Sequence, residues 1–116
     1  MKKITLTCAH AIVKYLIAQK ILINGKKEPL FPGVFGIFGH GNVACLGQAL
    51  EENQKELPTY RGHHEQNMAL TGIGYARAKR RQQIFVATSS VGPGATNMVT
   101  AAAVAMSNRL TILFLP

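Results

Sequence analysis

Acidic residues are scarce in this sequence, which has five glutamates and no aspartate against 13 lysines and arginines among its 116 residues. The resulting net charge of +8 would suit a nucleic-acid-binding protein, because Lys and Arg neutralise phosphates. The basic residues are scattered, however, and no aromatic side chains alternate with them to stack on bases. The densest cluster, at residues 77–81, falls where a helix is expected to end and where cations are favoured by the helix dipole. Nucleic acid is therefore not an expected partner.

The sequence also has few cysteines and no long apolar run. Cys8 and Cys45 are far apart and form no CxxC pair, and the adjacent His63 and His64 point in different directions, so neither a disulfide framework nor a metal site is expected. Both cysteines are predicted to be reduced residues in or near the core. No apolar run approaches the roughly 18 residues that cross a bilayer, and no apolar signal core follows the first residues. We expect no membrane contact and a cytoplasmic location.

The apolar fraction of 47% is enough for one compact domain over residues 1–116. Short β-branched and apolar runs alternate with segments of helical periodicity, which predicts an α/β fold with a parallel sheet flanked by helices. Residues 24–33 are predicted to form a loop lying on the domain. Strands are predicted at 33–38, 83–88 and 109–115, with a short extended piece at 59–60. Helices are predicted from a Thr5 or Thr7 cap to about Gln19, from an Asn42 cap to about Glu52, from His64 to about Lys79, and over 95–106.

Sheets of this kind bind ligands at the carboxyl ends of their strands, so the loops at 39–42, 61–65 and 89–94 form the candidate site. Glu65 is the most informative residue there, a lone carboxylate beside His64 at the predicted start of a helix. A buried carboxylate is costly unless a group hydrogen-bonds to it, so its position predicts a ligand or a partner. The helix dipole would lower its pKa and burial would raise it. Spacing alone leaves a helix-capping or surface role as the alternative.

Three motifs in these regions resemble those of one enzyme family. They are GHHEQ at residues 62–66, GYAR at residues 74–77 and ATSSVGPGATN at residues 87–97. In this order and spacing they are similar to the pyrimidine-binding domain of thiamine-diphosphate-dependent enzymes of the acetolactate synthase and pyruvate decarboxylase type. The resemblance implies a Rossmann-like domain and thiamine diphosphate as the cofactor.

The same resemblance implies roles for individual residues. Glu65 matches the catalytic glutamate that hydrogen-bonds to the pyrimidine ring and favours the tautomer able to take a proton from the thiazolium carbon. His40 matches a position where related decarboxylases carry an acidic residue facing the substrate, and an imidazole there can act as a general acid or base. Cofactor contacts are expected of Glu65, His64, Gly92 and Asn97, and substrate contacts of Asn42 and Ser90.

Within the family, two segments favour one branch. Residues 29–43, PLFPGVFGIFGHGNV, and the paired serines of TSSVGPGATN resemble enzymes that cleave a carbon–carbon bond of a cyclic 1,2-dione in inositol breakdown. Acetolactate synthases instead resemble FGYPGG and TSGPGATN at these places. An acetolactate synthase or a 2-oxo acid decarboxylase is the first alternative. A non-catalytic α/β ligand-binding or regulatory module is the second.

Family members are several times longer, so the resemblance implies a fragment: the first, C-terminally incomplete part of such an enzyme, inactive alone. In the family, Mg²⁺ and the diphosphate are held by a later domain, and this chain without aspartate contains no such motif. Residues 92–94 are therefore expected to shape the pyrimidine pocket rather than to bind phosphate. A homodimer or homotetramer is expected of the full-length protein. An unfinished product without independent function is the third alternative.

Overall fold

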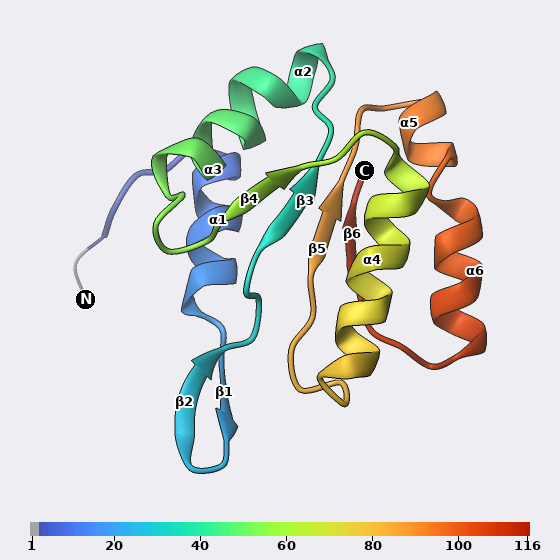
Figure 1. Cartoon of the computed structure of the whole chain (residues 1–116). Coiled ribbons are helices and arrows are strands. Elements are labelled where there is room, and N and C mark those ends of the chain that lie inside the picture. The colour runs from blue at the N-terminus through green and yellow to red at the C-terminus, as the bar shows by residue number, and fades with distance from the viewer. Residues whose placement is uncertain (1–2) are drawn as a thin grey trace.

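A parallel β-sheet forms the centre of the computed structural model, which describes residues 3–116 (Figure 1). The sheet has four strands in the order β4-β3-β5-β6, and every neighbouring pair is parallel. In its register, the Cα of Phe35 pairs with those of Tyr60 and Ala87. The predicted parallel α/β sheet is therefore confirmed. Its strands are β3 (Val34–Gly36), β4 (Thr59–Arg61), β5 (Val86–Thr88) and β6 (Leu113–Leu115).

Helices cover both faces of the sheet (Figure 1). Side chains alternate along the strands, so Val34 and Val86 face one helical layer while Ala87 faces the other. No helix within residues 3–116 is long and apolar enough to span a membrane. The first layer contains α1 (Cys8–Ala18), the π-helical segment η1 (Val43–Gly47) and α3 (Gln48–Glu52), and the second contains α4 (Glu65–Ala78) and α6 (Val99–Ser107). The short helices α2 (His40–Asn42) and α5 (Pro93–Thr96) follow β3 and β5.

A β-hairpin replaces the first half of the loop predicted at residues 24–33. The strands β1 (Lys20–Ile23) and β2 (Lys26–Pro29) pair antiparallel, apart from the main sheet. The turn between them is Asn24-Gly25, with φ angles of 51° and 78°. Asn-Gly is the dipeptide that best tolerates two positive φ angles in a two-residue hairpin turn. The sequence analysis did not predict β2, because its residues KKEP are polar and lack the β-branched and apolar residues typical of strands.

Two predicted helices differ from the structure. The second begins at His40 after Gly39 rather than at Asn42, so the predicted N-cap role of Asn42 is wrong. The helix predicted at 95–106 is interrupted, because α5 ends at Thr96 and α6 begins only at Val99. This interruption leaves the Asn97 side chain at the end of a helical turn rather than along a helix side. The predicted Thr7 cap of the first helix is confirmed by a 3.2 Å bond from the backbone N–H of His10 to its hydroxyl.

Both cysteines are exposed, which contradicts the prediction that they lie in or near the core. Cys8 is the first residue of α1, and the side of that helix that enters the core carries Val13 and Leu16 instead. Cys45 lies in η1, whose buried residue is Leu46. The general tendency of cysteine to be buried therefore gave a wrong prediction here, because larger apolar side chains occupy the buried faces of both helical segments.

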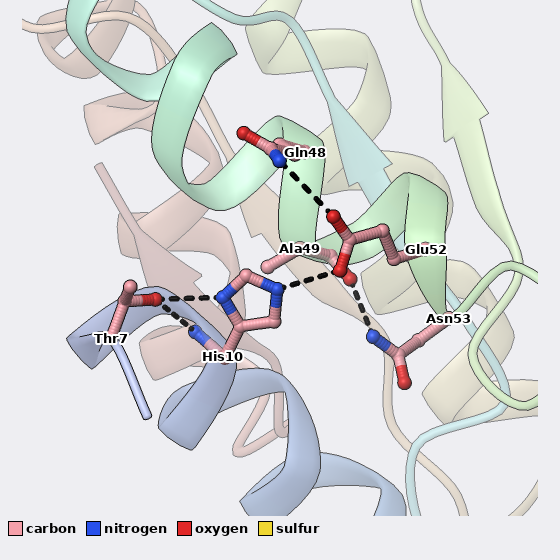
Figure 2. A network of polar contacts seen from close by, with 6 residues as sticks. All are labelled: Thr7, His10, Gln48, Ala49, Glu52 and Asn53. Atoms are coloured by element: carbon pink, nitrogen blue, oxygen red, sulfur yellow. Dashed lines mark hydrogen bonds and ion pairs between the residues drawn. The ribbon is translucent and has the colours of Figure 1, made fainter. Parts of the chain in front are cut away.

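A polar network joins α1 to α3 at the amino-terminal end of α1 (Figure 2). The hydroxyl of Thr7 lies 2.7 Å from Nδ1 of His10, and Nε2 of His10 lies 2.8 Å from a carboxylate oxygen of Glu52. Gln48 donates to the other oxygen of Glu52 at 3.1 Å. The bonds from His10 and then from Gln48 lower the pKa of Glu52 despite slight desolvation. The network fixes the helical segment that follows β3.

Two glycines in α4 provide a matched test of the packing between this helix and the sheet. A Cβ at buried Gly72 would lie 2.9 Å from Cδ1 of Ile112 and 3.2 Å from Cβ of Phe85, whereas a Cβ at exposed Gly74 would meet no atom within 4 Å. We expect Gly72→Ala to lower the free energy of unfolding by about 1 kcal/mol through overpacking. Gly74→Ala should raise it by about 0.5–1 kcal/mol, because alanine restricts the unfolded chain. Urea denaturation of both variants measures this, and equal shifts would contradict the packing.

Candidate active site

The candidate site lies where the chain reverses direction across the sheet. From β3 the chain moves outward to β4, then crosses back past β3 to β5. The three predicted loops leave the carboxyl ends of β3, β4 and β5 at one edge of the sheet (Figure 1). The loops after β3 and β5 are in close contact, since a Cβ at Gly39 would lie only 2.7 Å from Cβ of Ser90. Such a reversal point is the usual ligand site of an open parallel sheet.

Glu65 is the first residue of α4, and its carboxylate is held by a residue from the loop region that follows β5. Its Oε2 accepts a 2.8 Å hydrogen bond from Nδ2 of Asn97, which follows α5. The same amide nitrogen lies 3.3 Å from Nε2 of His64. His64 precedes the helix in an extended conformation and makes no side-chain cap. The structure therefore brings together three of the predicted cofactor residues.

The environment of Glu65 keeps its carboxyl group ionised. The hydrogen bond from Asn97 and then a bond to the backbone of Glu65 itself lower its pKa, and they outweigh the desolvation that raises it. Glu65 is only partly buried, contrary to the buried position expected from the sequence. An ionised carboxylate at the amino-terminal end of a helix is a suitable acceptor for a ligand N–H group.

Gly94 packs closely against Ser90 and this carboxylate. A Cβ at Gly94 would lie 2.4 Å from Oγ of Ser90 and 3.2 Å from Oε1 of Glu65. Any larger residue would therefore displace the serine and crowd the carboxylate. The motif glycine is thus required for close packing between the loop after β5 and the start of α4. A partly exposed carboxylate with one oxygen held by an amide offers the acceptor that an aminopyrimidine ring requires.

His40 and Ser90 lie on a neighbouring part of the same edge. With Phe38, Gly39 and Val43 they line an open hollow of about 430 Å³. The His40 side chain is exposed and makes no hydrogen bond among the described residues, so it is accessible to a ligand in this hollow. The structure thus places the predicted catalytic histidine and predicted substrate serine together.

Asn42 and Gly92 are less directly placed. The side-chain amide of Asn42 donates to the backbone carbonyl of Ser89 at 3.2 Å, so it connects the loops after β3 and β5. Gly92 is exposed, with a φ of 66° that favours glycine, and a Cβ there would meet no atom within 4 Å. Substrate contact by Asn42 and cofactor contact by Gly92 stay predictions.

A second hollow, of about 240 Å³, lies beside His64. Its lining includes Arg61 and Asn67, which the sequence analysis did not single out. Arg61 directly precedes the GHHEQ motif and Asn67 directly follows it, so their position next to the motif could have identified them as residues of the site. Within the part of the chain that the structure describes, no group of three or more His, Cys, Asp or Glu side chains could hold a metal ion.

The contact between Asn97 and Glu65 predicts a change in titration. We expect Asn97→Ala to raise the pKa of Glu65, because the largest cause of its lowering is removed. A lowered carboxyl pKa stabilises the fold above the unfolded-state pKa, and this contribution is lost as the pH falls through the folded value. The variant should therefore lose more stability at neutral than at acidic pH.

Carbon-13 NMR of the Glu65 carboxyl group measures this pKa directly. Asn108→Ala is the matched control, since Asn108 also follows a helix but its side-chain amide donates only to the carbonyl of Val104. An unchanged Glu65 titration in Asn97→Ala would show that the hydrogen bond does not set the pKa.

Comparison with known proteins agrees with this geometry. Residues 27–116 match the family described as "Thiamine pyrophosphate enzyme, N-terminal TPP binding domain". Relatives named 3D-(3,5/4)-trihydroxycyclohexane-1,2-dione hydrolase are 53% identical in Geobacillus thermodenitrificans (strain NG80-2) and 49% identical in Clostridium tetani (strain Massachusetts / E88), each over 116 residues. These alignments cover 100% of this chain but 18% of each relative. The chain belongs to the thiamine pyrophosphate enzyme family and corresponds to its N-terminal TPP-binding domain.

Proposed function

We propose that this chain supplies the pyrimidine-binding side of a thiamine diphosphate site in a hydrolase that cleaves a carbon–carbon bond of a cyclic 1,2-dione. The observation that supports it most is the partly exposed Glu65 carboxylate, positioned at the start of α4 by the hydrogen bond from Asn97. The family match supports the cofactor, and the name shared by relatives that are 48–53% identical supports the substrate and the reaction.

The proposed roles at the cofactor follow from these contacts. Glu65 accepts a hydrogen bond from the pyrimidine ring nitrogen, and Asn97 holds the carboxylate in the orientation that permits this. His64 lies beside the same amide and borders the pocket. Gly92 and Gly94 shape the loop against the ring. The bound cofactor supplies a nucleophilic carbon in its thiazolium ring, which no amino-acid side chain offers.

The proposed roles toward the substrate belong to the hollow beside this site. His40 can donate or accept a proton at a substrate oxygen or at the attacking water, as hydrolysis requires. The hydroxyl of Ser90 can hydrogen-bond to a hydroxyl of the ring. Asn42 acts mainly by holding the loops after β3 and β5 together, and it contacts the substrate from there.

Further parts of the proposal concern the whole enzyme. The chain spans 18% of the length of the relatives above, so catalysis by this segment alone is not expected. Mg²⁺, bound by residues outside this segment, would hold the diphosphate. A homodimer or homotetramer and a cytoplasmic location complete the proposal.

An assay of the full-length enzyme on two substrates tests the proposed function. With thiamine diphosphate and Mg²⁺ present, we expect hydrolysis of the cyclic dione to an open-chain deoxy-glucuronic acid and no turnover of pyruvate. Turnover of pyruvate instead would favour an acetolactate synthase or a 2-oxo acid decarboxylase. Failure to bind thiamine diphosphate at all would favour a non-catalytic ligand-binding module.

A further inference from the structure

The only two cysteines of the chain lie on one surface hollow. Cys8 at the start of α1 and Cys45 in η1 are 37 positions apart, yet both line the same space of about 390 Å³. The rest of the lining is mostly apolar and includes Ile12, Leu46 and Phe114. Cysteine is among the residues most often buried, so two exposed thiols facing one hollow are unusual. Exposure is also what makes a thiol open to oxidation.

Neither cysteine lies in the middle of a regular α-helix. In η1, the backbone N–H of Gln48 is shared between the carbonyls of Val43 and Cys45, so the helical hydrogen bonding is divided between two registers. Such π-helical turns are rare and often occur at functional sites. Cys8 follows residues 3–7, which are exposed and have no regular secondary structure. The two thiols thus lie at a helix start and in an irregular turn that border one hollow.

We propose that Cys8 and Cys45 form a reversible dithiol–disulfide site that links α1 to η1. The oxidant is a small-molecule disulfide such as oxidised glutathione. The thiolate of one cysteine attacks a sulfur of the reagent, forms a mixed disulfide and releases one small thiol. The second cysteine then attacks the protein sulfur of that mixed disulfide, which forms the Cys8–Cys45 bond and releases the second small thiol. Two electrons pass from the protein to the reagent, and the two protons leave with the two thiols.

The site would connect redox state to the edge of the sheet described above. Asn42 lines the same hollow and donates to the carbonyl of Ser89. His40 belongs to the same continuous helical segment as Cys45. A bond from η1 to α1 restrains this segment, so the loop after β3 moves less in the oxidised form. In a reducing compartment such a bond forms only transiently, as redox-sensing disulfides do.

Equilibration of the 116-residue chain with reduced and oxidised glutathione tests this proposal. We expect oxidation to remove both titratable thiols of the folded chain and two hydrogens from its intact mass, without a glutathione adduct, and dithiothreitol to restore both. The equilibrium constant should be larger for the folded chain than in guanidinium chloride, because folding places both thiols on one hollow. Amide hydrogen exchange over residues 39–47 should slow on oxidation.

Two single variants sharpen the result. Cys8→Ser and Cys45→Ser each keep one thiol, so each should retain one glutathione adduct under the conditions that leave the wild type with none. Circular dichroism establishes that both variants are folded. Two adducts on the wild type, a disulfide between two chains, or an equilibrium constant no larger than that of the unfolded chain would each overturn the proposal.

Discussion

Replacement of Glu65 by glutamine is expected to slow proton exchange at the thiazolium carbon of bound thiamine diphosphate by about 100-fold or more, within the range that a positioned acid or base contributes. The amide is nearly the same size as the carboxylate, so the contact with Asn97 and the fold should persist. It cannot, however, serve as the anionic acceptor for the pyrimidine ring. Hydrogen–deuterium exchange of the cofactor in the full-length enzyme, quenched and followed by NMR, measures the rate.

Glu56→Gln is the matched control for this experiment. Glu56 is an exposed glutamate between α3 and β4, and it makes no side-chain hydrogen bond in the part of the chain that the structure describes. Its replacement removes the same charge without touching the candidate site, so the exchange rate should be unchanged. Equal rates in the wild type and in Glu65→Gln would show that another group activates the cofactor.

Gly94→Ala is expected to weaken thiamine diphosphate binding by about tenfold or more, equivalent to about 1.4 kcal/mol. The added methyl group would lie 2.4 Å from Oγ of Ser90 and 3.2 Å from Oε1 of Glu65, so either the serine or the carboxylate must move. The loss should appear in the Kd because the carboxylate proposed to bind the pyrimidine ring is displaced or crowded. Isothermal titration of the full-length enzyme with cofactor and Mg²⁺ measures it.

Gly41→Ala separates this steric effect from a general glycine effect. Gly41 lies in α2 at the same edge of the sheet, and a Cβ there would meet no atom within 4 Å. Its replacement should leave cofactor affinity unchanged. Similar losses in both variants would indicate that backbone freedom, rather than the packing around Glu65, determines binding.

The sequence predicted the arrangement of the sheet and the location of its functional edge. The apolar runs around Val34 and Val86 are the two largely buried central strands, and they contrast clearly with the helical periodicity of residues 65–78. Once the strands were assigned, the position of Glu65 at the carboxyl edge followed from parallel connectivity. The three motifs then indicated the family that the comparisons confirmed.

The sequence did not predict features that depend on tertiary packing. The amide of Asn97 reaches Glu65 only because the chain breaks between α5 and α6, and alanine-rich composition gave no sign of that break. The predicted burial of the two cysteines is wrong, because composition does not reveal which side of a helix faces the core. The helix dipole and burial were expected to shift the pKa of Glu65 in opposite directions, but the largest effect is a lowering by a hydrogen bond from Asn97, which is far away in sequence.

A crystal structure of the full-length enzyme with thiamine diphosphate would test the central claim most directly, through the distance from the Glu65 carboxylate to the pyrimidine ring nitrogen. We predict a hydrogen bond of about 2.7 Å with Asn97 still bound to the other carboxylate oxygen. A pyrimidine ring held elsewhere, with the Glu65 carboxylate facing only solvent, would contradict the account.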